Sequence, residues 1–190
     1  QIVSTLIDML EDDVPTVSEA LCRAHSWRIG QEDLAESEGD VRRALLGHED
    51  IGCREGDDLA RVARDMIRWQ FGVQPIFDSR GSQIGSLELK TITGFVGREG
   101  WSRLPETVDE STLAKMGLLG PMVPMVDPME RVDTVSQVLS RSIDAVIFRW
   151  AEGRHSERPK FPDDCKGILE DGLHIVTSHD IMAFAMSRDG

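Results

Sequence analysis

The sequence is poor in cysteine, in long apolar stretches and in clustered positive charge. Cys22, Cys53 and Cys165 are the only cysteines, too few and too widely spaced for a disulfide framework or a zinc site. We therefore expect a reducing compartment and a cytoplasmic location. No apolar run approaches the ~20 residues that a membrane-spanning helix needs, so we expect no membrane association. The 21 Lys and Arg residues face 34 Asp and Glu residues, a net charge of −13, which disfavours nucleic acid as a partner.

The start of the chain lacks two further signals. Gln1 is followed by no basic segment, so we expect no signal peptide. The missing initial Met suggests a segment of a longer chain. The 190 residues, 40% hydrophobic and 29% charged, are enough for one domain or two small ones with a buried core.

Residues 1–46 are predicted to form a helical N-terminal extension. Apolar residues recur at four-residue spacing from Ile2 to Leu10, which is typical of an amphipathic helix. The segment Thr16–Glu19 fits a capping box that opens a second helix. The polar stretch Gln31–Asp40 is expected to be a connector.

Beyond residue 46 the predicted elements occur twice in one order: strand, helix, strand, turn, strand, helix. The first unit is predicted to contain Ile51–Arg54, Leu59–Trp69, Val73–Phe77, a turn at Asp78–Gly81, Ile84–Leu89 and a helix from Thr91. The second is predicted to contain Val123–Val126, Val132–Leu139, Ala145–Trp150, Leu173–Val176 and Ser178–Met186. A repeat of roughly 70–80 residues indicates two small domains in tandem and not a solenoid.

The second unit carries a long insertion, Ala151–Gly172, where the first has only a tight turn. Loops of this length without secondary structure of their own are mobile or functional, and we expect this one to be mobile. Its His155 is expected to be exposed. The four tryptophans of the chain are expected to pack against helices.

Two stretches of the sequence resemble a known family. Phe71–Gly85 (FGVQPIFDSRGSQIG) resembles the strand hairpin of a CBS domain, and Ile175–Phe184 (IVTSHDIMAF) is similar to the family's Thr-x-x-Asp signature at a strand-to-helix junction. The chain therefore resembles a tandem CBS-domain pair, or Bateman module. The resemblance implies an α+β fold of two β-α-β-β-α CBS domains, at residues 47–110 and 111–190, after the helical N-terminal extension.

The resemblance is closest to the C-terminal regulatory region of cystathionine β-synthase. It rests on the helix-to-strand passage Val138–Val146, on the polar insertion Ala151–Gly172 between the last two strands, and on Asp180–Phe184 at the end of the unit. The catalytic domain of that enzyme, with its cofactor-bearing lysine, is absent from this chain. The resemblance therefore implies a regulatory module that is not an enzyme, has no catalytic residues and requires no cofactor.

Thr177 and Asp180 are the strongest candidate binding residues. The start of a helix favours a phosphate or carboxylate because its backbone N–H groups point outward. Asp180 could accept hydrogen bonds from both hydroxyls of a ribose, and the Thr177 hydroxyl could hold a phosphate or the polar tail of a ligand. The same Thr-x-x-Asp pattern also forms a simple capping box without any ligand, and that alternative stays open.

The resemblance also implies a place for an adenine ring, in an apolar cleft between the two units. Phe71, Val73 and Gln74 from the first hairpin and Ile175 from the last strand would contact the ring. Phe71 could stack on the adenine, and the backbone around Val73 and Gln74 could bind the ring edge. Phe71 as an ordinary core residue remains an alternative.

Only one functional site is expected. At the positions equivalent to Thr177 and Asp180, the first unit has Glu88 and Thr91. The Glu88 carboxylate would repel a phosphate, and Thr91 is a poorer acceptor for ribose hydroxyls.

The expected function is the sensing of an adenosyl ligand. S-adenosylmethionine is preferred, because its cationic sulfonium and its lack of phosphate suit an acidic protein; AMP or ATP is the alternative. Binding would shift the relative orientation of the two units and so regulate an enzyme in the same or another chain. By analogy with such modules, the chain is expected to form a homodimer. A ligand-free dimerisation scaffold is a further alternative.

A different class of function stays open as a lesser alternative. Asp78 and Glu88 on paired strands could hold Mg²⁺, and Lys90 could orient the attacking water, as in nucleases with a PD-(D/E)xK core. No metal site is expected elsewhere, because His174 and His179 lack a third ligand.

Overall fold

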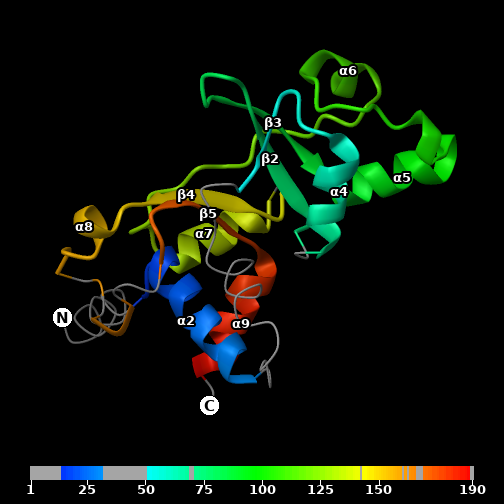
Figure 1. The fold of residues 1–190 in the computed structure, drawn as a ribbon. Coiled ribbons are helices and arrows are strands. Elements are labelled where there is room, and N and C mark those ends of the chain that lie inside the picture. The colour runs from blue at the N-terminus through cyan, green and yellow to red at the C-terminus, as the bar shows by residue number, and fades with distance from the viewer. Residues whose placement is uncertain are drawn as a thin grey trace. The chain divides into compact units, whose positions relative to one another are not determined.

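The fold of this chain is described by a computed structural model for most of its length (Figure 1). The described residues are 14–31, 51–68, 71–141, 143–159, 161, 163–165 and 169–188. They form two compact units. The central unit comprises residues 51–124 with 143–145, and the C-terminal unit comprises residues 14–31, 125–141 and the described residues within 146–188. The helix predicted from Ile2 to Leu10 and most of the predicted connector lie outside the described residues.

The central unit is a three-stranded sheet with helices packed against it. Its elements are β1 (Cys53–Arg54), α4 (Leu59–Arg68), β2 (Val73–Phe77), β3 (Gln83–Glu88), α5 (Leu89–Glu99), the 3₁₀ turn η1 (Trp101–Arg103) and α6 (Glu110–Lys115). The strand order is β1-β2-β3, with β1 parallel to β2 and β2 antiparallel to β3. The predicted hairpin is confirmed.

Local chemistry explains two of these elements. One oxygen of Asp78, Oδ1, accepts hydrogen bonds from the N–H groups of Arg80 and Ser82, each at 2.8 Å, which closes the turn between β2 and β3. Asp58 caps α4 by accepting from the N–H of Arg61 at 2.9 Å. The buried face of α4 carries Leu59, Val62, Ala63 and Met66. Ile67, the next residue after Met66, is 62% exposed.

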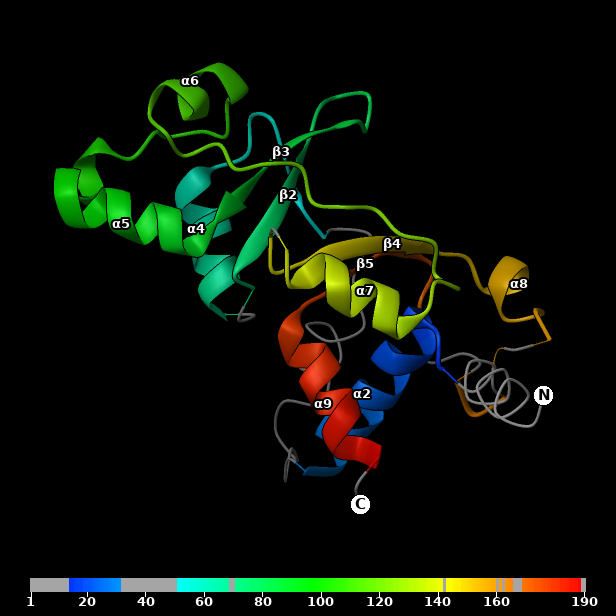
Figure 2. The same cartoon turned by 180° about the vertical axis from the view of Figure 1, so that it is seen from behind.

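The C-terminal unit packs helices with a two-stranded sheet. Its elements are α2 (Val17–Gln31), α7 (Val132–Leu139), β4 (Val146–Trp150), α8 (Glu152–His155), η2 (Asp163–Cys165), β5 (Gly172–Val176) and α9 (Ser178–Arg188). Strands β4 and β5 are antiparallel, and α2 and α9 lie side by side (Figures 1 and 2). The first helix of the described chain is therefore part of this unit's core. The predicted domain boundaries at 47–110 and 111–190 stay predictions.

The start of α2 confirms half of the predicted capping box. The hydroxyl of Thr16 accepts a hydrogen bond from the N–H of Glu19 at 3.2 Å. The Glu19 carboxylate forms an ion pair with Arg23 at 2.7 Å, one turn further along the helix. The cap is thus made by the threonine side chain.

Two expectations for the C-terminal unit are wrong. The predicted strand Val123–Val126 is only an isolated parallel bridge between Met125 and Ile147, because Pro124 has no N–H to extend the pairing. The second wrong expectation is an exposed His155 in the insertion. His155 is 8% exposed, and Phe161, Cys165 and Leu169 from the same segment lie in the buried core.

Candidate functional site

The predicted Thr-x-x-Asp site lies where β5 passes into α9. Strand β5 ends at the buried Val176, Thr177 is half-buried, and α9 begins at Ser178. The Asp180 side chain lies in the first helical turn with only 8% of the residue exposed. The predicted strand, helix and junction are therefore all present.

Asp180 and Thr177 are joined by three hydrogen bonds. Oδ2 of Asp180 accepts from the N–H of Thr177 at 2.8 Å and from its hydroxyl at 3.0 Å. In return, the N–H of Asp180 donates to the Thr177 carbonyl at 3.1 Å. This is one half of the capping box predicted as the ligand-free alternative, the half made by the aspartate, and it fixes a carboxylate at the positive end of the helix dipole.

Ile175 belongs to the same end of β5. It pairs with Ile147 across the sheet and is buried. Only Val176, the last residue of β5, separates Ile175 from Thr177. Three of the six predicted ligand residues, Ile175, Thr177 and Asp180, are therefore near neighbours in the C-terminal unit.

The other three predicted residues lie in the central unit around the start of β2. Phe71 is half-buried, and its N–H donates to the carbonyl of Met66 at 2.9 Å. Val73 and Gln74 are buried. The side-chain Oε1 of Gln74 accepts from the N–H of Gly52 at 2.8 Å, a link to the segment before β1 that the sequence analysis missed because no local pattern indicates it. That these three residues and Ile175, Thr177 and Asp180 bind one ligand together stays a prediction.

The two units differ at equivalent positions, as the sequence suggested. Glu88 precedes α5 as Thr177 precedes α9, and Thr91 is the third residue of its helix as Asp180 is. The Glu88 side chain makes no capping hydrogen bond. It forms an ion pair with Lys90 at 2.8 Å instead. The central unit therefore lacks the carboxylate cap of the C-terminal unit.

The alternative magnesium site is not supported by the geometry. Asp78 lies in the turn beyond the Phe77–Gln83 pair, whereas Glu88 pairs with Val73 at the opposite end of the hairpin. Four residues of strand correspond to ~13 Å, too far for both carboxylates to bind one Mg²⁺. The nuclease hypothesis is therefore wrong in its central requirement.

The histidines near the predicted site have separate environments. His174 is buried, stacks on Phe148 with ring centroids 5.2 Å apart, and places Nε2 2.8 Å from the Glu170 carbonyl. His179 is exposed on α9. Within the described ranges of the chain, no group of three or more His, Cys, Asp or Glu side chains is arranged to hold a metal ion.

One feature of the central unit has no counterpart in the sequence predictions. A cavity of about 530 Å³ lies around Trp101 and Asp58, and none of the six predicted ligand residues lines it. Trp101, expected to pack against helices, is 54% exposed. No local pattern could have placed Trp101 and Asp58 around one cavity, because tertiary contacts between distant segments form it.

Comparison with known proteins gives structural likeness only. No family model matches the sequence, and no curated protein matches it. Among solved structures, a CBS-domain protein from Agrobacterium tumefaciens is 13% identical, with a TM-score of 0.49, and the alignment covers 76% of this chain and 92% of that one. A CBS-domain protein of unknown function from Bacillus anthracis is 14% identical, with a TM-score of 0.48 and coverage of 78% and 93%.

A third structure is a CBS domain pair in complex with 5′-methylthioadenosine and S-adenosylmethionine. It is 19% identical, with a TM-score of 0.49 and coverage of 78% of this chain and 96% of that chain. All three are CBS-domain proteins, the family that the sequence resembles. In the described part of this chain, no helix combines the length and apolar character needed to span a bilayer.

Proposed function

We propose that this chain is a ligand-sensing regulatory module, a tandem CBS-domain pair that binds an adenosyl ligand and has no catalytic residues of its own. The proposal includes the domain boundaries 47–110 and 111–190 and the likeness to the regulatory region of cystathionine β-synthase. The observation that supports it best is the buried Asp180 carboxylate, fixed by Thr177 at a strand-to-helix junction.

Asp180 is the proposed ribose-binding residue. A carboxylate has two oxygens that accept hydrogen bonds, which matches the two adjacent hydroxyls of a ribose. Ribose binding releases the Thr177 hydroxyl from Oδ2, and that hydroxyl then faces the polar tail of the ligand. The N–H of Thr177 keeps its bond to Asp180, so the helix start stays capped while the ligand is bound.

The adenine ring is proposed to contact residues of both units. Ile175 supplies an apolar surface next to Thr177. Phe71 stacks on the ring, and the backbone at Val73 and Gln74 binds its edge. The Gln74 side chain holds Gly52 and is therefore assigned to support, not to direct ligand contact.

S-adenosylmethionine is the preferred ligand. The chain carries a net charge of −13, which favours a cationic sulfonium over the phosphates of AMP or ATP. Glu88, the counterpart of Thr177 in the central unit, adds a further carboxylate that disfavours phosphate. One ligand per chain is therefore expected.

Regulation is proposed to arise because the ligand binds one arrangement of the two units more tightly than the other. A ligand shifts an equilibrium between two arrangements only as far as it binds one of them more tightly. The bound arrangement would relieve or impose inhibition on an enzyme domain in the same or another chain. The module is proposed to act as a homodimer, which light scattering combined with size-exclusion chromatography would measure directly.

The test is isothermal titration calorimetry with S-adenosylmethionine, AMP and ATP in parallel. Asp180→Asn is the variant of choice, because an amide oxygen still accepts from the Thr177 N–H and keeps the cap, while the negative charge is lost. We expect one ligand to bind and Asp180→Asn to weaken it about tenfold or more. Asp133→Asn, an exposed acidic residue in the first turn of α7, is the matched control and should bind normally.

Two results would contradict the proposal. If none of the three ligands gives heat, the Thr177–Asp180 pair is a helix cap only and the dimerisation scaffold is favoured. If a ligand binds equally well to Asp180→Asn, the site lies elsewhere.

A further inference from the structure

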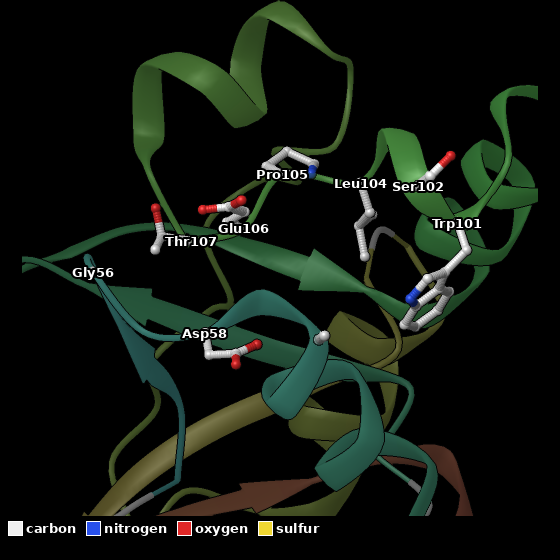
Figure 3. A pocket seen from close by; sticks show the side chains of 9 residues that line it. Gly56, Asp58, Trp101, Ser102, Leu104, Pro105, Glu106 and Thr107 are labelled. Carbon is white, nitrogen blue, oxygen red and sulfur yellow. The ribbon is translucent and has the colours of Figure 1, made fainter.

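The central unit contains an open groove that the proposed adenosyl site does not use (Figure 3). Its volume of about 530 Å³ falls within the ~300–1,000 Å³ of small-molecule sites. It lies between the start of α4, near Asp58 and Ala60, and the segment from Trp101 to Thr107 that follows α5. All of these residues belong to one unit, so the groove is complete within it.

Backbone hydrogen bonds hold the walls of the groove together. The segment 104–108 is fixed to the loop between β1 and α4 at three points. The N–H of Leu59 donates to the Glu106 carbonyl at 3.0 Å, the N–H of Val108 donates to the Asp57 carbonyl at 2.8 Å, and the N–H of Gly56 donates to the Val108 carbonyl at 2.8 Å. The groove is therefore preformed, which lowers the entropic cost of filling it.

Trp101 is presented at one end of the groove by a tight turn. Gly100 ends α5 with φ of 87°, and the N–H of Leu104 then donates to the Trp101 carbonyl at 3.1 Å. Figure 3 shows the Trp101 and Leu104 side chains at this end. The tryptophan remains 54% exposed, although an indole is among the side chains that gain most from burial. A fixed and accessible indole face is a surface that binds cations well.

The other end of the groove is acidic. Asp58 and Glu106 line it, and none of the lining residues is basic. Figure 3 shows both carboxylates on the side of the groove away from Trp101. Asp58 uses Oδ1 to cap α4, and Glu106 is exposed.

The basic residues nearest in sequence lie outside the lining. Arg61 pairs with Asp57 at 3.2 Å, and Arg64 donates to the carbonyl of Ala60, a lining residue, at 3.4 Å. Arg103 is part of η1 but does not line the groove. The overall charge of −13 adds to the attraction of a positive ligand.

We infer that this groove binds a small organic cation, an alkylammonium or guanidinium compound. The cationic group lies against the indole of Trp101, Asp58 and Glu106 attract it from the far end of the groove, and its alkyl part contacts Leu104 and Pro105. The inference does not depend on the proposed adenosyl site, because the two share no residue.

The experiment titrates the full chain with choline and with agmatine, followed by calorimetry. The matched control ligand is 3,3-dimethylbutanol, which has the shape of choline without its charge. We expect at least one of the two cations to bind, and the neutral analogue to bind about tenfold more weakly or not at all. Added salt should weaken the binding of the cation.

Variants separate the contributions of the groove. Trp101→Leu keeps an apolar surface and removes the indole, and should weaken binding about tenfold. Asp58→Asn keeps a good helix cap and Glu106→Gln keeps shape, so both remove only charge and should each weaken binding several-fold. Glu110→Gln, an exposed acidic residue of α6 outside the groove, should bind as the unmodified chain does.

The outcomes distinguish this inference from the proposed function. Asp180→Asn should leave the binding of the cation unchanged, and Trp101→Leu should leave the binding of an adenosyl ligand unchanged. Equal binding of 3,3-dimethylbutanol, or no binding of either cation at millimolar concentration, would overturn the inference. Binding of an arginine-containing peptide without binding of the free cations would also overturn it, in favour of a partner protein.

Discussion

The Asp180 carboxylate accepts two hydrogen bonds from Thr177 at one oxygen, from its N–H at 2.8 Å and from its hydroxyl at 3.0 Å. This pair ties the end of β5 to the first turn of α9. Asp180 is therefore a stabilising residue whether or not it also binds a ligand. The choice of substitution can separate the two roles.

The first prediction concerns this cap. Asp180→Ala removes the acceptor for both Thr177 hydrogen bonds and should lower the free energy of unfolding by ~1 kcal/mol. Asp180→Asn should cost less, because its amide oxygen still accepts from the Thr177 N–H. Urea unfolding followed by circular dichroism measures both. Equal losses for the two variants would show that the charge, and not the hydrogen bond, stabilises the helix start.

The second prediction concerns Gly52, next to β1. Its φ is +99°, and an added Cβ would lie 2.6 Å from Cε2 of Phe77 and 2.9 Å from the Pro75 carbonyl. Gly52→Ala therefore combines backbone strain with a clash and should destabilise the central unit by roughly 2–4 kcal/mol.

Gly81 provides the matched control for that substitution. Its φ is +79°, but nothing lies within 4 Å of an added Cβ. Gly81→Ala should therefore cost only the strain of the backbone, ~1 kcal/mol. Thermal unfolding measures the stability of both variants. If Gly81→Ala is as unstable as Gly52→Ala, the clash at Gly52 is not the cause of the loss.

The third prediction concerns the buried His155. Burial, with a smaller effect from Arg158, lowers its pKa below the usual value in the folded chain. The unfolded chain therefore takes up the proton first as the pH falls. The stability due to neutral His155 is present above about pH 6.5 and is lost as the pH falls from there towards the lower folded pKa.

His155→Phe tests this pH dependence. Phenylalanine preserves the aromatic contact with Trp150, whose ring centroid is 5.2 Å from that of His155, and it cannot be protonated. The loss of stability between pH 6.5 and 5 should be smaller in the variant than in the unmodified chain. If the variant and the unmodified chain lose the same free energy of unfolding over this pH range, His155 is not the group responsible.

The fourth prediction concerns the three cysteines, which are buried and form no disulfide. Burial, helped by the charge of Asp57, raises the pKa of the Cys53 thiol to about 12, so almost no thiolate is present at neutral pH. The native chain should react very slowly with an aromatic disulfide reagent, and the chain in denaturant should release three equivalents. Rapid reaction of one thiol in the native chain would show that it is accessible.

Much of the local structure could be predicted from the sequence. The bounds of β2 and α7 agree with the predictions, because alternation in a strand and helical spacing of apolar residues are short-range patterns. The turn at Asp78 also agrees, since the aspartate bonds to N–H groups within four residues of itself. The Thr-x-x-Asp pattern fixed the cap at α9 for the same reason.

Only the tertiary structure decided which segments pair as strands and which side chains of polar segments are buried. Val123–Val126 has the composition of a strand but makes a single bridge, because Pro124 interrupts its hydrogen bonding. His155 lies in a polar segment and is nevertheless buried, because Phe161 from that segment packs on Trp150 with ring centroids 4.7 Å apart.

The groove at Trp101 shows the same division most clearly. The local sequence determined that α5 ends at a glycine and that an aspartate caps the start of α4. It contained no pattern that relates Trp101 to Asp58, since the two come to line opposite ends of one groove only through backbone hydrogen bonds between segments that are distant in the chain. Short-range patterns act through neighbouring residues, whereas a binding surface depends on which distant backbones pair.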